Sequence, residues 1–165
     1  IIIVGGLGSV LGAVFGTVFI VALPEVFALF VSSLGGKLQE LLTTSAHEIK
    51  SVAKIPVITD LINDYFAGDI SALNSIQVRQ PGAPFSQAAW KAMKKVKPGA
   101  VISYADLAER AGSPAAVRAA GSACAKNAIV LIVPCQRIVK TGGALGNYAY
   151  GLNKKEWLLR HEGAL

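Results

Sequence analysis

Hydrophobic and polar residues are distributed in three different ways along the 165 residues of this chain. The first 24 residues carry no charged side chain, and glycines recur every fourth residue at Gly8, Gly12 and Gly16. A run of about 20 apolar residues can cross a bilayer, and small residues at that spacing let a second helix approach closely. Residues 1–36 therefore predict an apolar helical segment that spans a membrane, with a buried core hairpin as the alternative.

The middle of the chain, residues 37–80, alternates apolar and polar positions at helical spacing. Residues 38–52 predict an amphipathic helix, and residues 58–66 predict a second helix that ends at Gly68. Residues 75–84 have the composition of a linker. This connector shows no candidate chemistry.

The tail, residues 81–165, shows short amphipathic segments separated by turn residues. We expect helices over 86–95, 104–111 and 114–126, the last two joined by a Gly-Ser turn. Two short helices joined in this way favour a helix-turn-helix, although many core helix pairs share the pattern. The predicted starting signals are Ser86 as a cap, Ser103-x-x-Asp106 as a capping box, and Pro114 at the first helical position.

Charge is concentrated in this tail. The whole chain has a formal net charge of +6, whereas residues 79–165 carry thirteen Lys or Arg against four acids. The predicted helix pair lies in this most basic part of the chain, which favours the helix-turn-helix interpretation. Two cysteines without a C-x-x-C pair exclude a disulfide framework and favour an intracellular setting. Two histidines without further ligands argue against a zinc site, and we predict no metal.

The third predicted helix has almost no bulky side chains apart from Arg118. Ala115, Ala119, Gly121 and Ser122 lie around it in the sequence. A helix with such small residues can approach a sugar-phosphate wall closely, with one arginine reaching past it. The alternative is an ordinary alanine-rich packing helix.

Cys135 is the candidate nucleophile. The β-branched run 128–133 predicts a strand that ends at Pro134, and Cys135 follows it, where we expect a partly exposed site. Positive neighbours favour the thiolate, which is the reactive form. Cys124, within the alanine-rich helix, is expected to be an inert packing residue.

Several motifs in order carry a family resemblance. The segment VPCQRIV follows Asn127 and precedes GALGNYAYGLNKKEWLLRHEG, while PFSQAAW and VISYADLA lie upstream. From about Ile62 to Leu165 the chain resembles the O6-alkylguanine-DNA alkyltransferases, also called methylated-DNA–protein-cysteine methyltransferases. The resemblance implies a mostly α domain with a short β element and a winged-helix-like helix-turn-helix. That family usually carries a small sheet-containing domain before this region, where the apolar head stands here.

The resemblance also implies a chemistry. Cys135 would attack the alkyl carbon of an O6-alkylguanine and keep the alkyl group as a thioether, so each molecule would act once and need no cofactor. Tyr104 would protonate or polarise the leaving base, and Asn127 would hold the turn beneath the cysteine. Gln136 and Glu162 would complete the catalytic group.

The implied partner is double-stranded DNA containing alkylated guanine, bound by a monomer in the cytoplasm and nucleoid. Arg118 would enter the base stack in place of the flipped nucleotide. The other residues implied to contact DNA are Ala115, Ala119, Gly121, Ser122 and Arg137, and those implied to form the lid and pocket are Tyr148, Ala149, Tyr150, Gly151 and Lys155.

One departure from the family pattern concerns the residue after the cysteine. The family has Pro-Cys-His-Arg, and Gln136 stands at the histidine position. A glutamine amide can orient a water molecule but cannot accept its proton at neutral pH. We therefore expect a higher thiol pKa and slower transfer, with a hydrogen bond from Gln136 to Glu162 preserving the geometry.

The sequence leaves other functions open. Residues 1–26 resemble part of the membrane subunit of ABC importers for branched-chain amino acids, so a membrane contact or tether through residues 1–36 is one expectation. A fusion fragment without repair activity is therefore an alternative. A second alternative is a non-catalytic relative that only binds the lesion. A cysteine hydrolase ranks last, because His161 is the one nearby base in the sequence and no oxyanion motif accompanies it.

Overall fold

The computed structural model of the chain describes residues 2–3 and 57–165. The predicted membrane segment (1–36), apart from Ile2 and Ile3, and the predicted amphipathic helix over 38–52 lie outside the described residues. The chain divides into two compact units, Ile1–Gln80 and Pro81–Leu165.

In the first unit, the strand β1 (Ile2–Ile3) pairs in parallel with β2 (Val78–Arg79). Between them in sequence lie the helix α4 (Ile58–Ala67) and the short 3-10 helix η2 (Ala72–Ser75). The predicted helix with a glycine end is confirmed: Gly68 has a φ of 117°, and its N–H donates to carbonyls of the last turn. A side chain would be strained in that left-handed conformation, so the glycine ends the helix.

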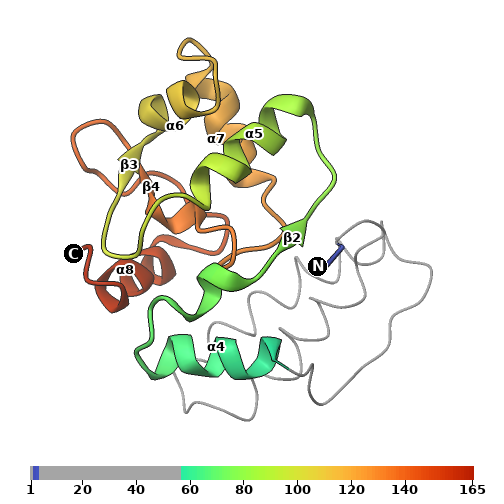
Figure 1. The fold of residues 1–165 in the computed structure, drawn as a ribbon. Helices are drawn as coiled ribbons and strands as arrows, with labels where there is room; N and C mark the ends of the chain where they lie inside the picture. Colours follow the sequence, from blue (N-terminus) through green and yellow to red (C-terminus); the bar gives the residue numbers. More distant parts are fainter. Residues whose placement is uncertain (1, 4–56) are drawn as a thin grey trace. The chain divides into compact units, whose positions relative to one another are not determined.

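The second unit contains four helices and a two-stranded parallel sheet (Figure 1). The sheet pairs β3 with β4, two segments far apart in the sequence. The elements are α5 (Pro84–Met93), β3 (Ile102–Ser103), α6 (Tyr104–Arg110), α7 (Val117–Ala125), η3 (Cys135–Arg137), β4 (Ile138–Val139) and α8 (Leu152–His161).

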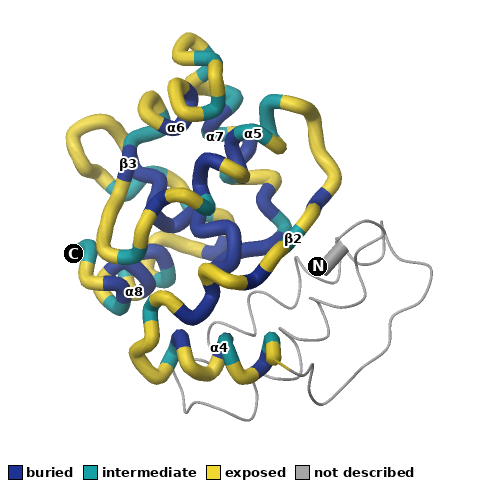
Figure 2. The backbone as a smooth tube through the Cα atoms, in the orientation of Figure 1, coloured by how far each residue is buried: buried dark blue, intermediate teal, exposed yellow. Residues whose placement is uncertain are grey.

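Helices α5, α6 and α7 pack against one another around a core of small and aliphatic side chains. Figure 2 shows the buried stretches of these helices facing inward. The indole Nε1 of Trp90 donates to the carbonyl oxygen of Ala123 at 2.8 Å, which ties α5 to α7. Gly82 lies against the same indole, since a Cβ there would be 2.5 Å from a ring carbon of Trp90. The predicted helix-turn-helix pair, α6 and α7, therefore packs against α5.

The helix starts agree with the sequence in one case and differ in two. The capping box of Ser103 and Asp106 is present: the hydroxyl of Ser103 accepts from the N–H of Asp106, and the carboxylate of Asp106 accepts from the N–H of Ser103. Helix α5 begins at Pro84, so the prediction that Ser86 caps it was wrong. Helix α7 begins at Val117, because residues 114–116 form a turn in which the N–H of Ala116 donates to Ser113.

The predicted strand over 128–133 was wrong. The run is buried, as its composition indicates, but its backbone forms tight turns: Ile132 donates to Val130, and Val133 donates to Ile129. Leu131 has a φ of 70°, which no strand allows. The β-branched residues thus signal burial here, and the strand partner of β3 comes a few residues later, at β4.

Within residues 57–165 and the pair 2–3, every helix is too short or too polar to cross a membrane. In the same part of the chain, no three His, Cys, Asp or Glu side chains gather closely enough to hold a metal ion.

Candidate active site around Cys135

Cys135 begins the short helix η3, directly after the buried run and Pro134. Its N–H donates to the carbonyl of Val133 at 2.8 Å, so the backbone turns sharply at the thiol. The residue is only 5% exposed. The expectation of a partly exposed cysteine is therefore corrected, because the turns of the preceding run carry the thiol inward and not to the end of a strand.

Asn127 fixes this turn from one side. Its Nδ2 donates to the carbonyl of Val133 at 2.7 Å, and its Oδ1 accepts from the N–H of Ile129 at 3.1 Å. Both ends of the buried run are thus tied to one buried amide. A side-chain hydrogen bond from Asn127 also reaches Cys135, where it lowers the pKa of the thiol.

Several opposing influences act on the acidity of Cys135. Burial raises the pKa of the thiol above its ordinary value of 9.0, and this effect is the largest. The hydrogen bond from Asn127 and the positive charge of Lys155 lower the pKa, but they do not cancel the burial. The group is therefore mainly a neutral thiol at pH 7.

Lys155 supplies a cation beneath the site. It lies on α8, is completely buried, and its Nζ donates to the carbonyls of Ile138 and Leu145. Burial lowers the pKa of the Lys155 ammonium, and the nearby thiols Cys135 and Cys124 act in the opposite direction. The ammonium is thus held by two carbonyls within electrostatic reach of the candidate nucleophile.

Tyr104 brings a phenol to the same place from the start of α6. Its hydroxyl donates to the carbonyl of Asn147 at 3.4 Å. Burial, followed by the charges of Cys124 and Cys135, raises the pKa of Tyr104 to about 12, so the phenol keeps its proton at neutral pH. Gly146 has a φ of 68°, and a Cβ there would lie 3.0 Å from the phenol oxygen, so this contact needs glycine.

Behind the cysteine lies a buried polar cluster made by η3 and the end of α8. The Nε2 of Gln136 donates to Glu162 Oε1 at 2.9 Å, as the sequence predicts. Arg137 donates to both oxygens of the same carboxylate, at 2.7 and 3.0 Å, and to the carbonyl of Val96 at 2.6 Å. Arg137 is 3% exposed, so it braces the site from inside, and its expected role as a DNA contact does not fit.

The other polar atom of Gln136 has a different environment. Its Oε1 is buried and has no hydrogen-bond donor among the described residues. An orphaned buried carbonyl costs free energy of about 1–3 kcal/mol. The Oε1 atom of Gln136 can therefore accept a hydrogen bond next to Cys135, but it cannot remove the proton of the thiol.

The predicted lid, residues 148–151, leads from the site into α8. The rings of Tyr148 and Tyr150 meet edge to face with centroids 5.7 Å apart. Burial raises the pKa of Tyr150 to about 12, with a smaller contribution from Cys135, so the ring lies near the thiol. Ala149 and Gly151 are exposed.

The predicted DNA-contact residues, apart from Arg137, lie on or just before α7. Arg118 and Ser122 lie one turn apart on the helix, and the Ser122 hydroxyl donates to the Arg118 carbonyl at 3.2 Å. Arg118 is exposed. A Cβ at Gly121 would meet no atom within 4 Å, so that part of the helix borders open space. Ala115 is exposed in the preceding turn, and Ala119 is half-buried.

Cys124 lies nearer to Cys135 and Tyr104 than its sequence pattern indicates. Burial and the charge of Cys135 raise the pKa of Cys124 to about 12, which agrees with the prediction of an inert thiol, and the thiol also acts on Tyr104. The thiol of Cys124, on α7, therefore lies within electrostatic reach of Cys135 and Tyr104. Helical periodicity carries no signal for this position, because the approach of α7 to η3 depends on the turns between them.

Comparisons with known proteins agree with this arrangement. The sequence model described as "6-O-methylguanine DNA methyltransferase, DNA binding domain" matches residues 84–164. The O6-methylguanine methyltransferase of Mycobacterium tuberculosis is 32% identical, with a TM-score of 0.60 over 76% of this chain and 73% of that one. The chain belongs to this methyltransferase family.

Two further relatives define how far the match extends. The methylated-DNA–protein-cysteine methyltransferase of Shigella flexneri is 41% identical over 108 residues, which are 66% of this chain and 63% of the relative. The structure of M. tuberculosis OGT in complex with DNA is 36% identical, with a TM-score of 0.59 over 65% of each chain. The chain thus spans slightly less than two thirds of these proteins. The comparisons support the alkyltransferase resemblance and not the importer resemblance of residues 1–26.

Proposed function

We propose that this protein repairs O6-alkylguanine in DNA by transferring the alkyl group once to Cys135. The observation that carries the proposal is the gathering of three groups around one thiol: the amide of Asn127, the ammonium of Lys155 and the phenol of Tyr104. The family membership supports it, because relatives are named methylated-DNA–protein-cysteine methyltransferases.

The transfer is a single displacement. The Cys135 thiol first loses its proton to water. The thiolate then forms a bond to the alkyl carbon while the bond from that carbon to guanine O6 breaks and its electron pair passes to the base. The neutral phenol of Tyr104 gives its proton to the leaving guanine and takes one back from water. Lys155 favours the thiolate before attack. No other group then removes the alkyl group, so the protein is consumed.

Helix α7 supports binding of duplex DNA. Its small residues leave room for a sugar-phosphate wall, and Arg118 is exposed on the same helix. Extrusion of a base costs a few kcal/mol, and an inserted side chain can stabilise the gap that the base leaves. A similar protein has been solved in complex with DNA, which supports DNA binding by this chain.

Access to the thiol is the step that the geometry makes demanding. Because Cys135 is 5% exposed and Tyr150 lies buried near it, a purine reaches the sulfur only when the lid, residues 148–151, moves aside. Ala149 and Gly151 of this segment are exposed. We therefore propose that the segment moves to admit the base.

The decisive experiment uses a duplex containing one O6-methylguanine. After incubation, mass spectrometry of the Cys135 peptide should show one added methyl group, and the duplex should contain normal guanine. Cys135→Ala should bind the duplex without removing the methyl group.

The outcomes separate the alternatives. Lesion binding without transfer by the unmodified chain would favour a lesion-binding protein, which Gln136 and the raised pKa of Cys135 make the second candidate. Neither binding nor transfer would refute the repair function.

A further inference from the structure

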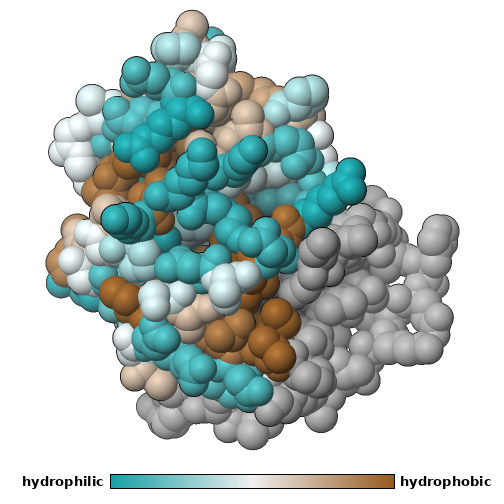
Figure 3. Space-filling view, in the orientation of Figure 1, coloured by the Kyte–Doolittle hydropathy of each residue, from teal (hydrophilic) through white to brown (hydrophobic). Residues whose placement is uncertain are grey.

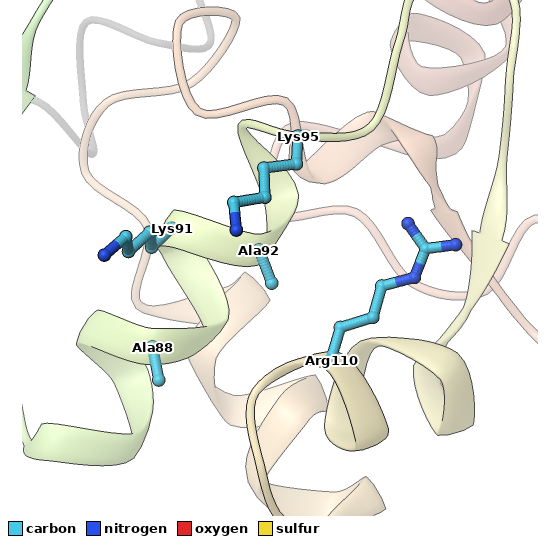
Figure 4. A pocket seen from close by; sticks show the side chains of 5 residues that line it. All are labelled: Ala88, Lys91, Ala92, Lys95 and Arg110. Carbon is cyan, nitrogen blue, oxygen red and sulfur yellow. The ribbon is translucent and has the colours of Figure 1, made fainter.

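A basic groove lies between α5 and α6 (Figure 4), and none of its lining residues belongs to the cysteine site. Its volume is about 450 Å³. Figure 4 shows Ala88 and Ala92 on the α5 wall and Arg110 on the α6 wall, with Lys95 above them. The groove is lined by Ala88, Lys91, Ala92, Lys95 and Arg110.

The groove faces away from the proposed DNA-contact helix. On α5, Trp90 points to α7, since it donates to Ala123. At about 100° per residue, Ala88 and Ala92 lie about 160° around α5 from Trp90. No α7 residue lines the groove among the described residues. The α5 residues that line the groove therefore lie on the side of α5 opposite to α7.

The chemistry of the lining selects a phosphodiester. Three cations, all exposed, line the groove, and no carboxylate does. Arginine can bind two phosphate oxygens with its planar fork, and lysine adds point charges. The apolar part of the lining is two methyl groups with no aromatic anchor, which protein partners usually need. Figure 3 shows hydrophilic side chains over this face of α5 and α6.

One acidic side chain close to the groove is already engaged. Asp106 lies one turn before Arg110 on α6, and the Arg110 charge contributes to lowering the pKa of its carboxyl. That carboxylate accepts from the N–H and hydroxyl of Ser103 in the capping box, and these bonds are the larger cause of the lowered pKa. The guanidinium of Arg110 therefore keeps its donors for a ligand.

We propose that this groove binds the phosphate backbone of a second DNA duplex while α7 holds the first. The inference rests on the proposed function only in assigning α7 to the first duplex. A single protein then bridges two segments, and it can pass between them without release.

The test is a capture experiment with undamaged DNA. One biotinylated duplex is immobilised and saturated with protein, and a second, fluorescent duplex is then added. The unmodified protein should retain the second duplex, and the triple variant K91Q/K95Q/R110Q should retain at least tenfold less of it while it binds the first duplex as before. Replacing each cation that neutralises a phosphate should also lower the salt slope of second-duplex binding by about 0.9.

Two controls accompany the capture experiment: a lysine variant outside the groove and a measurement of stoichiometry. Lys97→Gln removes a cation outside the groove and should leave retention unchanged. Sedimentation should find one protein with two duplexes. The proposal is wrong if the unmodified protein retains no second duplex, if the triple variant retains it fully or binds the first duplex equally weakly, or if two proteins are needed.

Two further experiments are needed. One distinguishes duplex phosphate from free phosphate as the ligand of the groove, and the other distinguishes failure of the groove from failure of the proposed DNA site on α7. If micromolar inorganic phosphate at constant ionic strength already abolishes second-duplex retention, the ligand is free phosphate and the DNA assignment is wrong. Arg118→Ala should weaken the first duplex alone. If it does not, the assignment of α7 fails, while the groove is still judged by the triple variant.

Discussion

At the scale of single residues, the site combines a buried thiol with a neighbour that cannot take its proton. Burial raises the pKa of Cys135, and Lys155 and Asn127 oppose this effect only in part. Gln136 lies where a base would act, with its Nε2 on Glu162 and its Oε1 unpartnered within the described part of the chain. The rate should therefore depend on the small fraction of thiolate.

The first prediction concerns pH. Below the thiol pKa the thiolate fraction grows about tenfold per pH unit, so the single-turnover rate should rise steadily from pH 7 to 9. Gln136→His should raise the rate at pH 7 about tenfold or more and flatten this dependence, since a general base contributes about 10²–10⁴-fold. Stopped-flow kinetics with O6-methylguanine duplexes measures both.

A matched variant separates the effect of a basic side chain at position 136 from the effect of side-chain shape. Gln136→Met keeps the length without the amide and should not accelerate transfer. An unchanged rate in Gln136→His would show that proton removal does not limit the reaction.

At the scale of elements, η3 is held by the end of α8. The carboxylate of Glu162 accepts from Gln136 and Arg137, and all three residues are buried. Removal of one partner from a buried ion pair leaves the other charge uncompensated. Such pairs are therefore sensitive to loss of one member even where their net stabilisation is small.

We expect Glu162→Gln to lower the free energy of unfolding by about 3–5 kcal/mol. The matched control is Glu156→Gln, whose partner Arg160 lies at 2.8 Å on the exposed surface of the same helix. An exposed pair of this kind contributes about 0–1 kcal/mol. Urea unfolding of the two variants should separate them clearly, and equal losses would mean that the buried cluster adds nothing specific.

A second prediction at this scale concerns α7. Because a Cβ at Gly121 meets open space, Gly121→Ala should raise stability by up to about 1 kcal/mol through helix propensity. Gly121→Leu should also fold, yet it should weaken duplex binding at least tenfold, because its side chain occupies the surface proposed for DNA. Thermal melts and fluorescence anisotropy test the two halves, and tight binding by Gly121→Leu would place the duplex elsewhere.

These elements also show what sequence can and cannot reveal. The capping box of Ser103 and Asp106 and the glycine end of α4 depend on neighbours in sequence, so their patterns predicted them. The run 128–133 looked like a strand because burial and strand formation favour the same β-branched residues. Its real conformation depends on hydrogen bonds from Asn127. The place of Cys124 beside the site required the packing of α7, which no local pattern contains.

At the scale of the whole molecule, four neutral acids are gathered around the cysteine site. Burial raises the pKa of Cys124 from 9.0 to about 12, and of Tyr104 and Tyr150 from 10.0 to about 12. The pKa of Cys135 shifts in the same direction. The unfolded chain therefore releases these protons at lower pH than the folded protein does.

Stability should accordingly fall as the pH rises from about 9 towards 12, because ionisation favours the unfolded chain throughout that interval. The lowered pKa values of Lys155 and Lys94 act in the opposite direction, as two groups against four. Melting temperatures measured from pH 7 to 11 should decline above pH 9, and less steeply in Cys124→Ala. A melting temperature that stays constant to pH 11 would contradict the buried placement of these groups.

The hydrogen bonds from Gln136 and Arg137 to Glu162 also have a consequence for how the protein is synthesised. Gln136 and its carboxylate partner are separated by 26 positions along the chain, so a ribosome adds the nucleophile well before the group that locks the loop behind it. A polypeptide interrupted between the two would carry the sulfur on a loosened loop beside an arginine without its counter-ion. Truncated products should then lack alkyl-transfer activity. The activity should appear only once the end of α8 has been synthesised.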